Sequence, residues 1–215
     1  MAKFALACEG ITDQIVIENI LCGFYKDNNL DEDISPLQPP YDATTQKQKE
    51  GEFGGWEMLL EYLSEKRFRD DVVNNEYVII QIDTDVSDHP NFAVSQTMDS
   101  IEEFVGRVAQ RLISQIDSKE DFYEGHKEKI IFAISVHSLE CWLLPLYRTY
   151  KKEKIVSCYD ALKRESKAIS VEKTYRKYDE LSRPFLKHKK LMTIIPQNTS
   201  FDIFINALPD EANIL

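Results

Sequence analysis

Three short segments of the chain are apolar at almost every position, namely residues 3–8, 77–82 and 129–136. Strands buried on both faces, as in a parallel sheet, have this continuous apolar pattern rather than an alternating one. The connections between the three segments are long, and parallel pairing requires long crossover connections. The pattern therefore predicts three central strands of a mainly parallel sheet.

Between these segments, apolar residues recur every three or four positions, which is the spacing of helices that bury one face. A first helix is expected soon after Gly10, with Thr12 or Asp13 as its cap. Another is expected to begin directly after the third strand, near Leu139. The remaining predicted helices cover residues 56–68, 96–116 and 200–208. Helices alternating with parallel strands indicate an α/β, Rossmann-like fold.

Two regions depart from this alternation. Residues 26–55 contain three prolines and three glycines and read as a long loop or insertion, with a short extended segment around residues 34–37. Residues 146–215 are helical in pattern, with a short edge strand expected at 193–195. We therefore expect a domain at 1–145, with an insertion at about 26–55, followed by a basic, mostly helical C-terminal region at 146–215.

Charge is distributed unevenly along the 215 residues, whose formal net charge is −11. Residues 145–195 hold 14 Lys and Arg against 6 Asp and Glu, a net of +8, and the remainder holds 12 against 31. The overall acidity argues against a protein that coats nucleic acid. An acidic body with a basic section is compatible with holding a polyanion, and equally with a solvated helical surface.

Cysteine spacing and hydropathy indicate the cellular compartment in which the protein is expected. Cys8, Cys22, Cys141 and Cys158 show no Cys-x-x-Cys spacing and lie among apolar residues, so buried reduced thiols are expected rather than a disulfide or zinc site. No apolar run approaches the roughly 18 residues of a membrane span, and the N-terminus has no secretory pattern. We expect a cytoplasmic protein with no membrane partner.

Carboxylates follow each predicted strand. Glu9 and Gly10 end the first, Asp83 and Asp85 end the second, and Glu140 follows the third. Open α/β sheets bind ligands along the edge where parallel strands end. Carboxylates gathered there suit Mg²⁺ or Mn²⁺. Each also has a structural explanation, since such residues cap helices, form turns or favour a helix N-terminus.

The order strand, Glu-Gly-x-Thr-Asp, helix, followed by a strand ending in Asp-x-Asp, resembles the TOPRIM family, the catalytic domain of topoisomerases, primases, small ribonucleases and OLD-family nucleases. The resemblance rests on Glu9, Gly10, Asp83 and Asp85 and covers about the first 145 residues. The sequence is most similar to small TOPRIM-like proteins of bacterial anti-phage and mobile-element systems, whose later Ser-x-Glu-x-Trp-Leu-Leu is here residues 138–144.

That resemblance implies a metal-dependent nuclease that acts on DNA or RNA as an effector in defence against phage or plasmids. Asp83 and Asp85 would hold Mg²⁺ or Mn²⁺, and Glu9 would be a further ligand or a general acid/base. Glu140 would complete the set. His137, Lys173 and Lys187 are candidates for substrate contact, although a structural histidine is equally compatible with the position of His137.

Two alternatives remain at this stage. A haloacid-dehalogenase-like phosphatase would use Asp83 as nucleophile and Asp85 as acid/base, but no clear acidic pair follows a later apolar run. A metal-binding module without catalysis, partner to a separate ATPase subunit, would also retain the acidic site. The lack of an ATPase, zinc ribbon or primase extension argues against a complete topoisomerase or primase.

Overall fold

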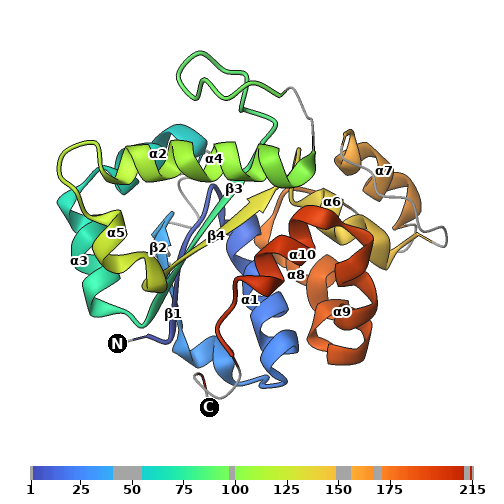
Figure 1. Ribbon diagram of the computed structural model, residues 1–215. Coiled ribbons are helices and arrows are strands. Elements are labelled where there is room, and N and C mark those ends of the chain that lie inside the picture. Colours follow the sequence, from blue (N-terminus) through green and yellow to red (C-terminus); the bar gives the residue numbers. More distant parts are fainter. Residues whose placement is uncertain are drawn as a thin grey trace.

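The computed structural model of the protein describes residues 2–40, 55–96, 100–148, 156–166, 171–210 and 214. Within these residues, four parallel strands form one sheet in the order β2-β1-β3-β4. Helices cover both faces of the sheet (Figure 1), which confirms an α/β fold compatible with a Rossmann-like architecture. The strands are β1 (Phe4–Ala7), β2 (Ile34–Gln38), β3 (Tyr77–Asp83) and β4 (Ile130–Ser135).

Side chains of the central strands alternate between two hydrophobic cores, as the pleat of a strand requires. In β1, Phe4 and Leu6 enter the first core, whereas Ala5 and Ala7 enter the second. Both faces are therefore buried, which explains the continuous apolar pattern of the sequence. The first core is covered by α1 (Ile11–Tyr25), and the second by α2 (Trp56–Leu63), α3 (Lys66–Asn74) and α4 (Ile101–Ile116).

The chain after β4 folds into short helices that pack beside α1 and complete the first core (Figure 1). The prediction of a mostly helical C-terminal region is confirmed for the described residues. The helices are α6 (Glu140–Leu143), α7 (Cys158–Glu165), α8 (Tyr175–Ser182), α9 (His188–Ile194) and α10 (Thr199–Asn206), with the 3₁₀ turns η4 (Leu144–Leu146), η5 (Arg183–Leu186) and η6 (Ile195–Gln197) between them.

The structure corrects some predicted elements. The prediction of an edge strand at 193–195 is wrong, because these residues end α9 and begin η6. Leu191, Ile194 and Ile195 are buried at helical spacing against the first core, which leaves no sheet edge for them. The helix predicted over 56–68 is divided at Ser64, after which α3 begins. The extended segment near 34–37 is confirmed as β2, although residues 41–54 of the predicted insertion lie outside the described residues.

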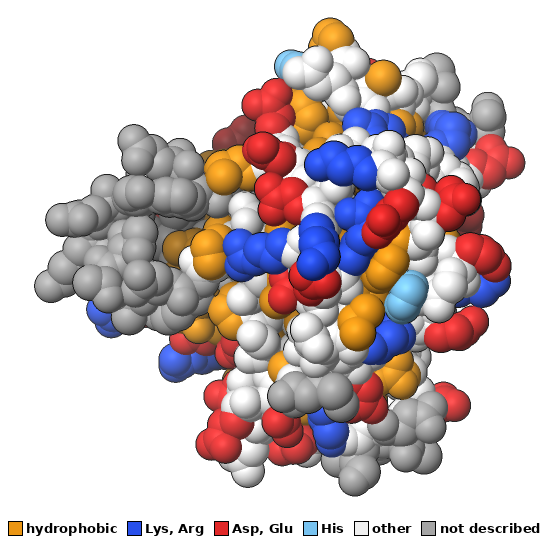
Figure 2. Space-filling model, turned by 90° about the vertical axis from the view of Figure 1, so that its left-hand side faces the viewer, with side chains coloured by type: hydrophobic (Ala, Val, Ile, Leu, Met, Phe, Trp, Pro, Cys, Tyr) orange, Lys and Arg blue, Asp and Glu red, His pale blue; other side chains and the backbone are white. Residues whose placement is uncertain are grey.

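The remaining short elements flank the sheet. The 3₁₀ turn η1 (Leu30–Asp33) leads into β2, and α5 (Tyr123–His126) and η3 (Lys127–Lys129) lead into β4. On the side formed by α3 and α5, acidic and basic side chains are interspersed (Figure 2), and ion pairs such as Arg69–Glu120 join them. In the described part of the chain, no helix is both long and apolar enough to cross a bilayer.

The expectation of four reduced thiols is wrong for two cysteines. Cys141 and Cys158 form a disulfide, with their Cα atoms 5.0 Å apart, whereas Cys8 and Cys22 are free and buried. The bond arises because α6 packs against α7, and the separation of 17 residues carries no signal of that contact. Structural disulfides are uncommon in reducing compartments, so the bond gives no support to the expected cytoplasmic location.

Candidate active site

The strand order places the candidate site at a reversal in the sheet. The chain passes from β1 outward to β2, then back across β1 to β3 and β4. At such a switch point the helices leave the sheet on opposite faces, and a crevice forms at the carboxyl ends of the two central strands. Glu9 follows β1 at this edge of the sheet, and Asp83 ends β3 beside it.

Hydrogen bonds join the ends of these two strands directly. The backbone N–H of Asp83 donates to Oε2 of Glu9 (3.3 Å). Gln81, which is fully buried, bridges the same two residues. Its Oε1 accepts from the backbone N–H of Glu9 (3.3 Å), and its Nε2 donates to Oδ1 of Asp83 (3.0 Å). Gln81 was missed by sequence reasoning, although an amide inside an otherwise apolar strand is a signal of such a role.

The strand β4 is followed by Glu140, which lies at the same edge of the sheet. The backbone N–H of Leu139 donates to Oδ1 of Asp83 (3.0 Å), which fixes the start of α6 beside the end of β3. Glu140 follows immediately and is 4% exposed. The hydroxyl of Tyr178, from α8, donates to Oε1 of Glu140. The structure therefore gathers Glu9, Asp83 and Glu140 around one sheet edge, and Asp85 follows Asp83 there.

A fifth carboxyl group belongs to the site. Thr12 or Asp13 is expected from sequence as a helix cap; the N-cap of α1 is Gly10, and the Asp13 carboxyl, in the first turn, accepts a hydrogen bond from the backbone N–H of Gly10. Asp13 is 9% exposed, and its carboxyl group interacts with those of Glu9 and Asp83. A Cβ atom on Gly10 would be 3.0 Å from Oδ2 of Asp13. The four-residue spacing of Glu9 and Asp13 is the signal in the sequence for this placement.

Burial and crowding raise the pKa values of carboxyl groups in the site. Burial raises the pKa of Glu9 to about 7, and Asp85 and Glu140 act in the same direction. Burial, followed by repulsion from the neighbouring carboxylates, holds the pKa of Asp13 and of Asp83 well above the ordinary range. Asp83 is densely surrounded by protein, although part of its side chain remains accessible to solvent. The site therefore favours protons or a cation.

Asp85 and Lys173 lie closer to solvent than the other groups. Burial raises the pKa of Asp85, while His137 and Lys173 act to lower it. Burial acts to lower the pKa of Lys173, but Glu140, Asp83, Asp13 and Asp85 outweigh it and raise that pKa. The Nζ atom of Lys173 also lies 5.5 Å from the centre of the Tyr159 ring. The structure therefore places Lys173, one of the candidates for substrate contact, near the acidic residues.

The structure does not bring Lys187 to the site. Lys187 is the N-cap residue of α9, and the ring of its neighbour His188 contacts the carbonyl oxygen of Gly23 (3.0 Å). Gly23 lies near the far end of α1, about 20 Å along the helix axis from Gly10. The Lys187 candidate therefore has no place in the carboxylate site, because a basic run in the sequence does not reveal which end of a helix it packs against.

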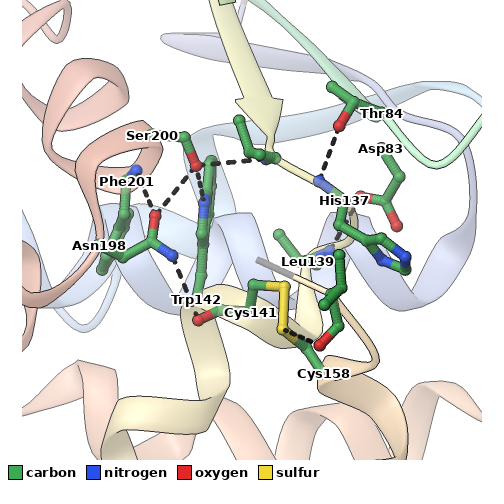
Figure 3. Close-up of a disulfide and its surroundings, with 12 residues drawn as sticks. Asp83, Thr84, His137, Leu139, Cys141, Trp142, Cys158, Asn198, Ser200 and Phe201 are labelled. Atoms are coloured by element: carbon green, nitrogen blue, oxygen red, sulfur yellow. Dashed lines mark hydrogen bonds between the residues drawn. A yellow bond between two sulfur atoms is a disulfide. The ribbon is translucent and has the colours of Figure 1, made fainter. Parts of the chain in front are cut away.

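His137 lies at the site in a strained conformation. Its φ of 67° is in the left-handed region. The backbone N–H of His137 donates to Oγ1 of Thr84 (2.7 Å), and its carbonyl oxygen accepts from the backbone N–H of Asp85 (2.9 Å). Figure 3 shows His137 and Asp83 together beyond the end of β4. Nδ1 of His137 is buried and has no hydrogen-bond partner in the described part of the chain. Strain of this kind is concentrated at functional sites.

Two substitutions at His137 measure this strain. His137→Gly and His137→Ala both remove the imidazole, but only glycine adopts a positive φ without cost. We expect the glycine variant to be more stable than the alanine variant by about 1 kcal/mol. Urea unfolding of both proteins gives the difference. Equal stabilities would contradict a strained backbone at this position.

Glu18, outside the site, provides a separate pH prediction. Burial raises its pKa to about 7, and repulsion from Asp31 and Asp179 adds to the effect. Because the pKa of Glu18 in the folded protein exceeds the ordinary value of 4.5, its contribution to stability is complete below about pH 4.5 and is lost as pH rises through 7. Glu18→Gln should therefore raise the free energy of unfolding at pH 8 by about 1–2 kcal/mol, after allowance for solvent, and should leave it unchanged at pH 4.5. Urea titrations at the two pH values test this, and a gain of equal size at both would refute it.

The donor set is suited to a hard divalent cation. Mg²⁺ and Mn²⁺ prefer carboxylate oxygens, and the acidic side chains here outnumber the nearby basic side chains Lys173 and His137. Within the described residues, however, no three His, Cys, Asp or Glu side chains are already grouped as metal ligands. Two of the carboxylate oxygens accept hydrogen bonds from the protein instead, namely Oδ1 of Asp83 from Leu139 and Gln81, and Oε1 of Glu140 from Tyr178. The carboxylates match such an ion in donor type and in charge. To bind it, their free oxygen atoms must move closer together.

Comparison with known proteins identifies no relative: no family model, no curated protein and no solved structure matches the chain.

Proposed function

We propose that this protein is a metal-dependent nuclease of the TOPRIM type, which hydrolyses phosphodiester bonds in DNA or RNA with Mg²⁺ or Mn²⁺. The observation that carries the proposal is the gathering of Glu9, Asp83, Asp85 and Glu140 at the carboxyl ends of three adjacent parallel strands. Their order along the chain is the one that motivates the resemblance to TOPRIM nucleases. A role as an effector in defence against phage or plasmids, with or without an ATPase partner, is part of the same proposal.

Each residue has a defined task in this proposal. Asp83 and Asp85 would hold the ion, with Glu140 completing the set, and Glu9 would be a further ligand or a proton-transfer group. When bound, the ion would activate water and neutralise charge on the scissile phosphate. Lys173 lies beside the carboxylates with a positive charge available for a substrate phosphate, and His137 offers a ring nitrogen at the same edge.

The phosphatase alternative is less well supported. It needs an acidic pair after a later apolar run, and the sequence has no clear one. Oδ1 of Asp83 also accepts hydrogen bonds from Leu139 and Gln81, which hold the side chain against the protein. A screen of phosphate monoesters separates the two activities.

The experiment is a cleavage assay of the purified protein on DNA and tRNA with Mg²⁺ and with Mn²⁺. We expect cleavage that is lost in Glu9→Ala and Asp83→Ala. Retention of cleavage in both variants would show that these carboxylates are not the active site. Binding of the ion without any turnover would favour a module that acts only with a partner.

Two lysines provide a matched comparison. Lys173→Ala should reduce cleavage by about 100-fold, because removal of one preorganised positive contact to a reacting phosphate typically costs that much. Lys187→Ala makes the same chemical change at the far end of α1 and should alter cleavage less than twofold. Rate measurements at saturating Mn²⁺ test the pair. Equal losses in the two variants would show that Lys173 has no special role.

A further inference from the structure

We propose that Tyr178, in the C-terminal helix α8, is a positioning residue that presents Glu140 to the carboxylate site; this inference rests on the proposed function. The Tyr178 hydroxyl donates to Oε1 of Glu140. Tyr178 is 1% exposed and Glu140 is 4% exposed, so neither group exchanges this partner for bulk water. The contact joins residues 38 positions apart and makes the C-terminal helices part of the site.

The backbone that carries Glu140 is held by other contacts (Figure 3). The Oγ atom of Ser200 accepts from Nε1 of Trp142 (2.8 Å) and from the backbone N–H of Val136 (3.3 Å). The disulfide from Cys141 to Cys158 ties the same short helix to α7. Loss of the Tyr178 hydroxyl therefore leaves α6 in place and changes the direction and charge environment of the Glu140 side chain alone.

Tyr178 is itself fixed relative to the site. Its ring is in the first core, and its carbonyl oxygen accepts from Oγ of Ser182 (2.6 Å). Nδ2 of Asn19 donates to the same Ser182 hydroxyl (2.8 Å), which joins α8 to α1. Because α1 has Gly10 as its N-cap, directly after Glu9, one connected set of contacts links the helix of Tyr178 to the helix that follows Glu9.

Such a hydrogen bond has a clear effect on a ligand carboxylate. It occupies one oxygen and orients the other. Outer partners of metal ligands typically contribute ten- to 100-fold to metal affinity. Tyr178 is thus assigned an effect on ion binding that operates entirely through Glu140.

Calorimetric titration with Mn²⁺ tests the proposal. Tyr178→Phe should bind Mn²⁺ about ten- to 100-fold more weakly than the original protein. Tyr147→Phe is the matched control, because its hydroxyl donates to the carbonyl oxygen of Leu181 (2.7 Å) in the same helical layer, and its affinity should change less than twofold. Circular dichroism and thermal melting establish that both variants are folded.

A double substitution distinguishes positioning from a general structural role. Glu140→Gln should itself weaken Mn²⁺ binding, and adding Tyr178→Phe to it should cause no further loss. Unchanged binding in Tyr178→Phe, or a further tenfold loss in the double variant, would overturn the inference while leaving the proposed function intact. Unchanged binding in Glu140→Gln would overturn the inference and also remove Glu140 from the proposed ligand set. Absence of Mn²⁺ binding in the original protein would overturn both.

Discussion

Replacing Asp83 with asparagine should stabilise the metal-free protein and abolish its stabilisation by Mn²⁺. Asparagine keeps the acceptor that Leu139 and Gln81 use, while it removes a charge repelled by Asp13 and Glu9. We expect a gain of about 1–2 kcal/mol at pH 8 in the absence of metal. Because the folded pKa of Asp83 is raised, this gain should vanish below about pH 4, where the carboxyl is protonated in both states.

Addition of Mn²⁺ should reverse the order of the two proteins. An ion present at 100 times its dissociation constant stabilises the original protein by about 2.7 kcal/mol, and Asp83→Asn should show no such gain. Asp88→Asn is the control, because Asp88 is exposed and lies in the segment that follows the same strand. Thermal melting with and without Mn²⁺ measures the stability of the original protein, Asp83→Asn and Asp88→Asn. A loss of stability in metal-free Asp83→Asn at pH 8 would contradict the account of mutual repulsion.

Gly23→Ala should destabilise the protein by about 3 kcal/mol or more. A Cβ atom at this position would lie 1.9 Å from the carbonyl oxygen of Phe185 and 2.8 Å from its carbon. Both are backbone atoms, so no side-chain rotation relieves the overlap, and the chain around η5 must move away from α1. Urea unfolding monitored by circular dichroism measures the loss.

Gly106→Ala is the matched control, since Gly106 is also inside a helix. A Cβ atom there meets nothing within 4 Å, and the residue is exposed. Alanine should therefore stabilise α4 by about 1 kcal/mol through its higher helix propensity. If both glycine variants shifted stability in the same direction, the close approach of α1 and η5 would be wrong.

The central sheet was predictable because its chemistry is local. Residues 77–82 are apolar at nearly every position, and this single pattern indicates a strand, its burial on both faces and its parallel pairing. The edge strand β2 gave a weaker signal, since Pro36 lies within it and only its last two residues are buried. The edge strand expected at 193–195 failed because short apolar runs do not distinguish a strand from the buried side of a helix.

The candidate site was predictable only in part. Glu9, Asp83, Asp85 and Glu140 could be placed because each follows a strand, and strand ends meet at one edge of a parallel sheet. Asp13 follows Glu9 by four residues, a spacing that could have placed it. Tyr178 could not be placed, because its position depends on how α8 packs against α1. The disulfide from Cys141 to Cys158 depends in the same way on the contact between α6 and α7.

The central claim is that these carboxylates converge on a divalent cation. The most direct measurement is an anomalous difference map from crystals of the protein soaked in Mn²⁺. The account predicts a peak at the carboxyl ends of β1 and β3, within coordination distance of Asp83 and at least one of Glu9, Asp85 and Glu140. No peak at saturating Mn²⁺, or a peak away from this edge of the sheet, would contradict it.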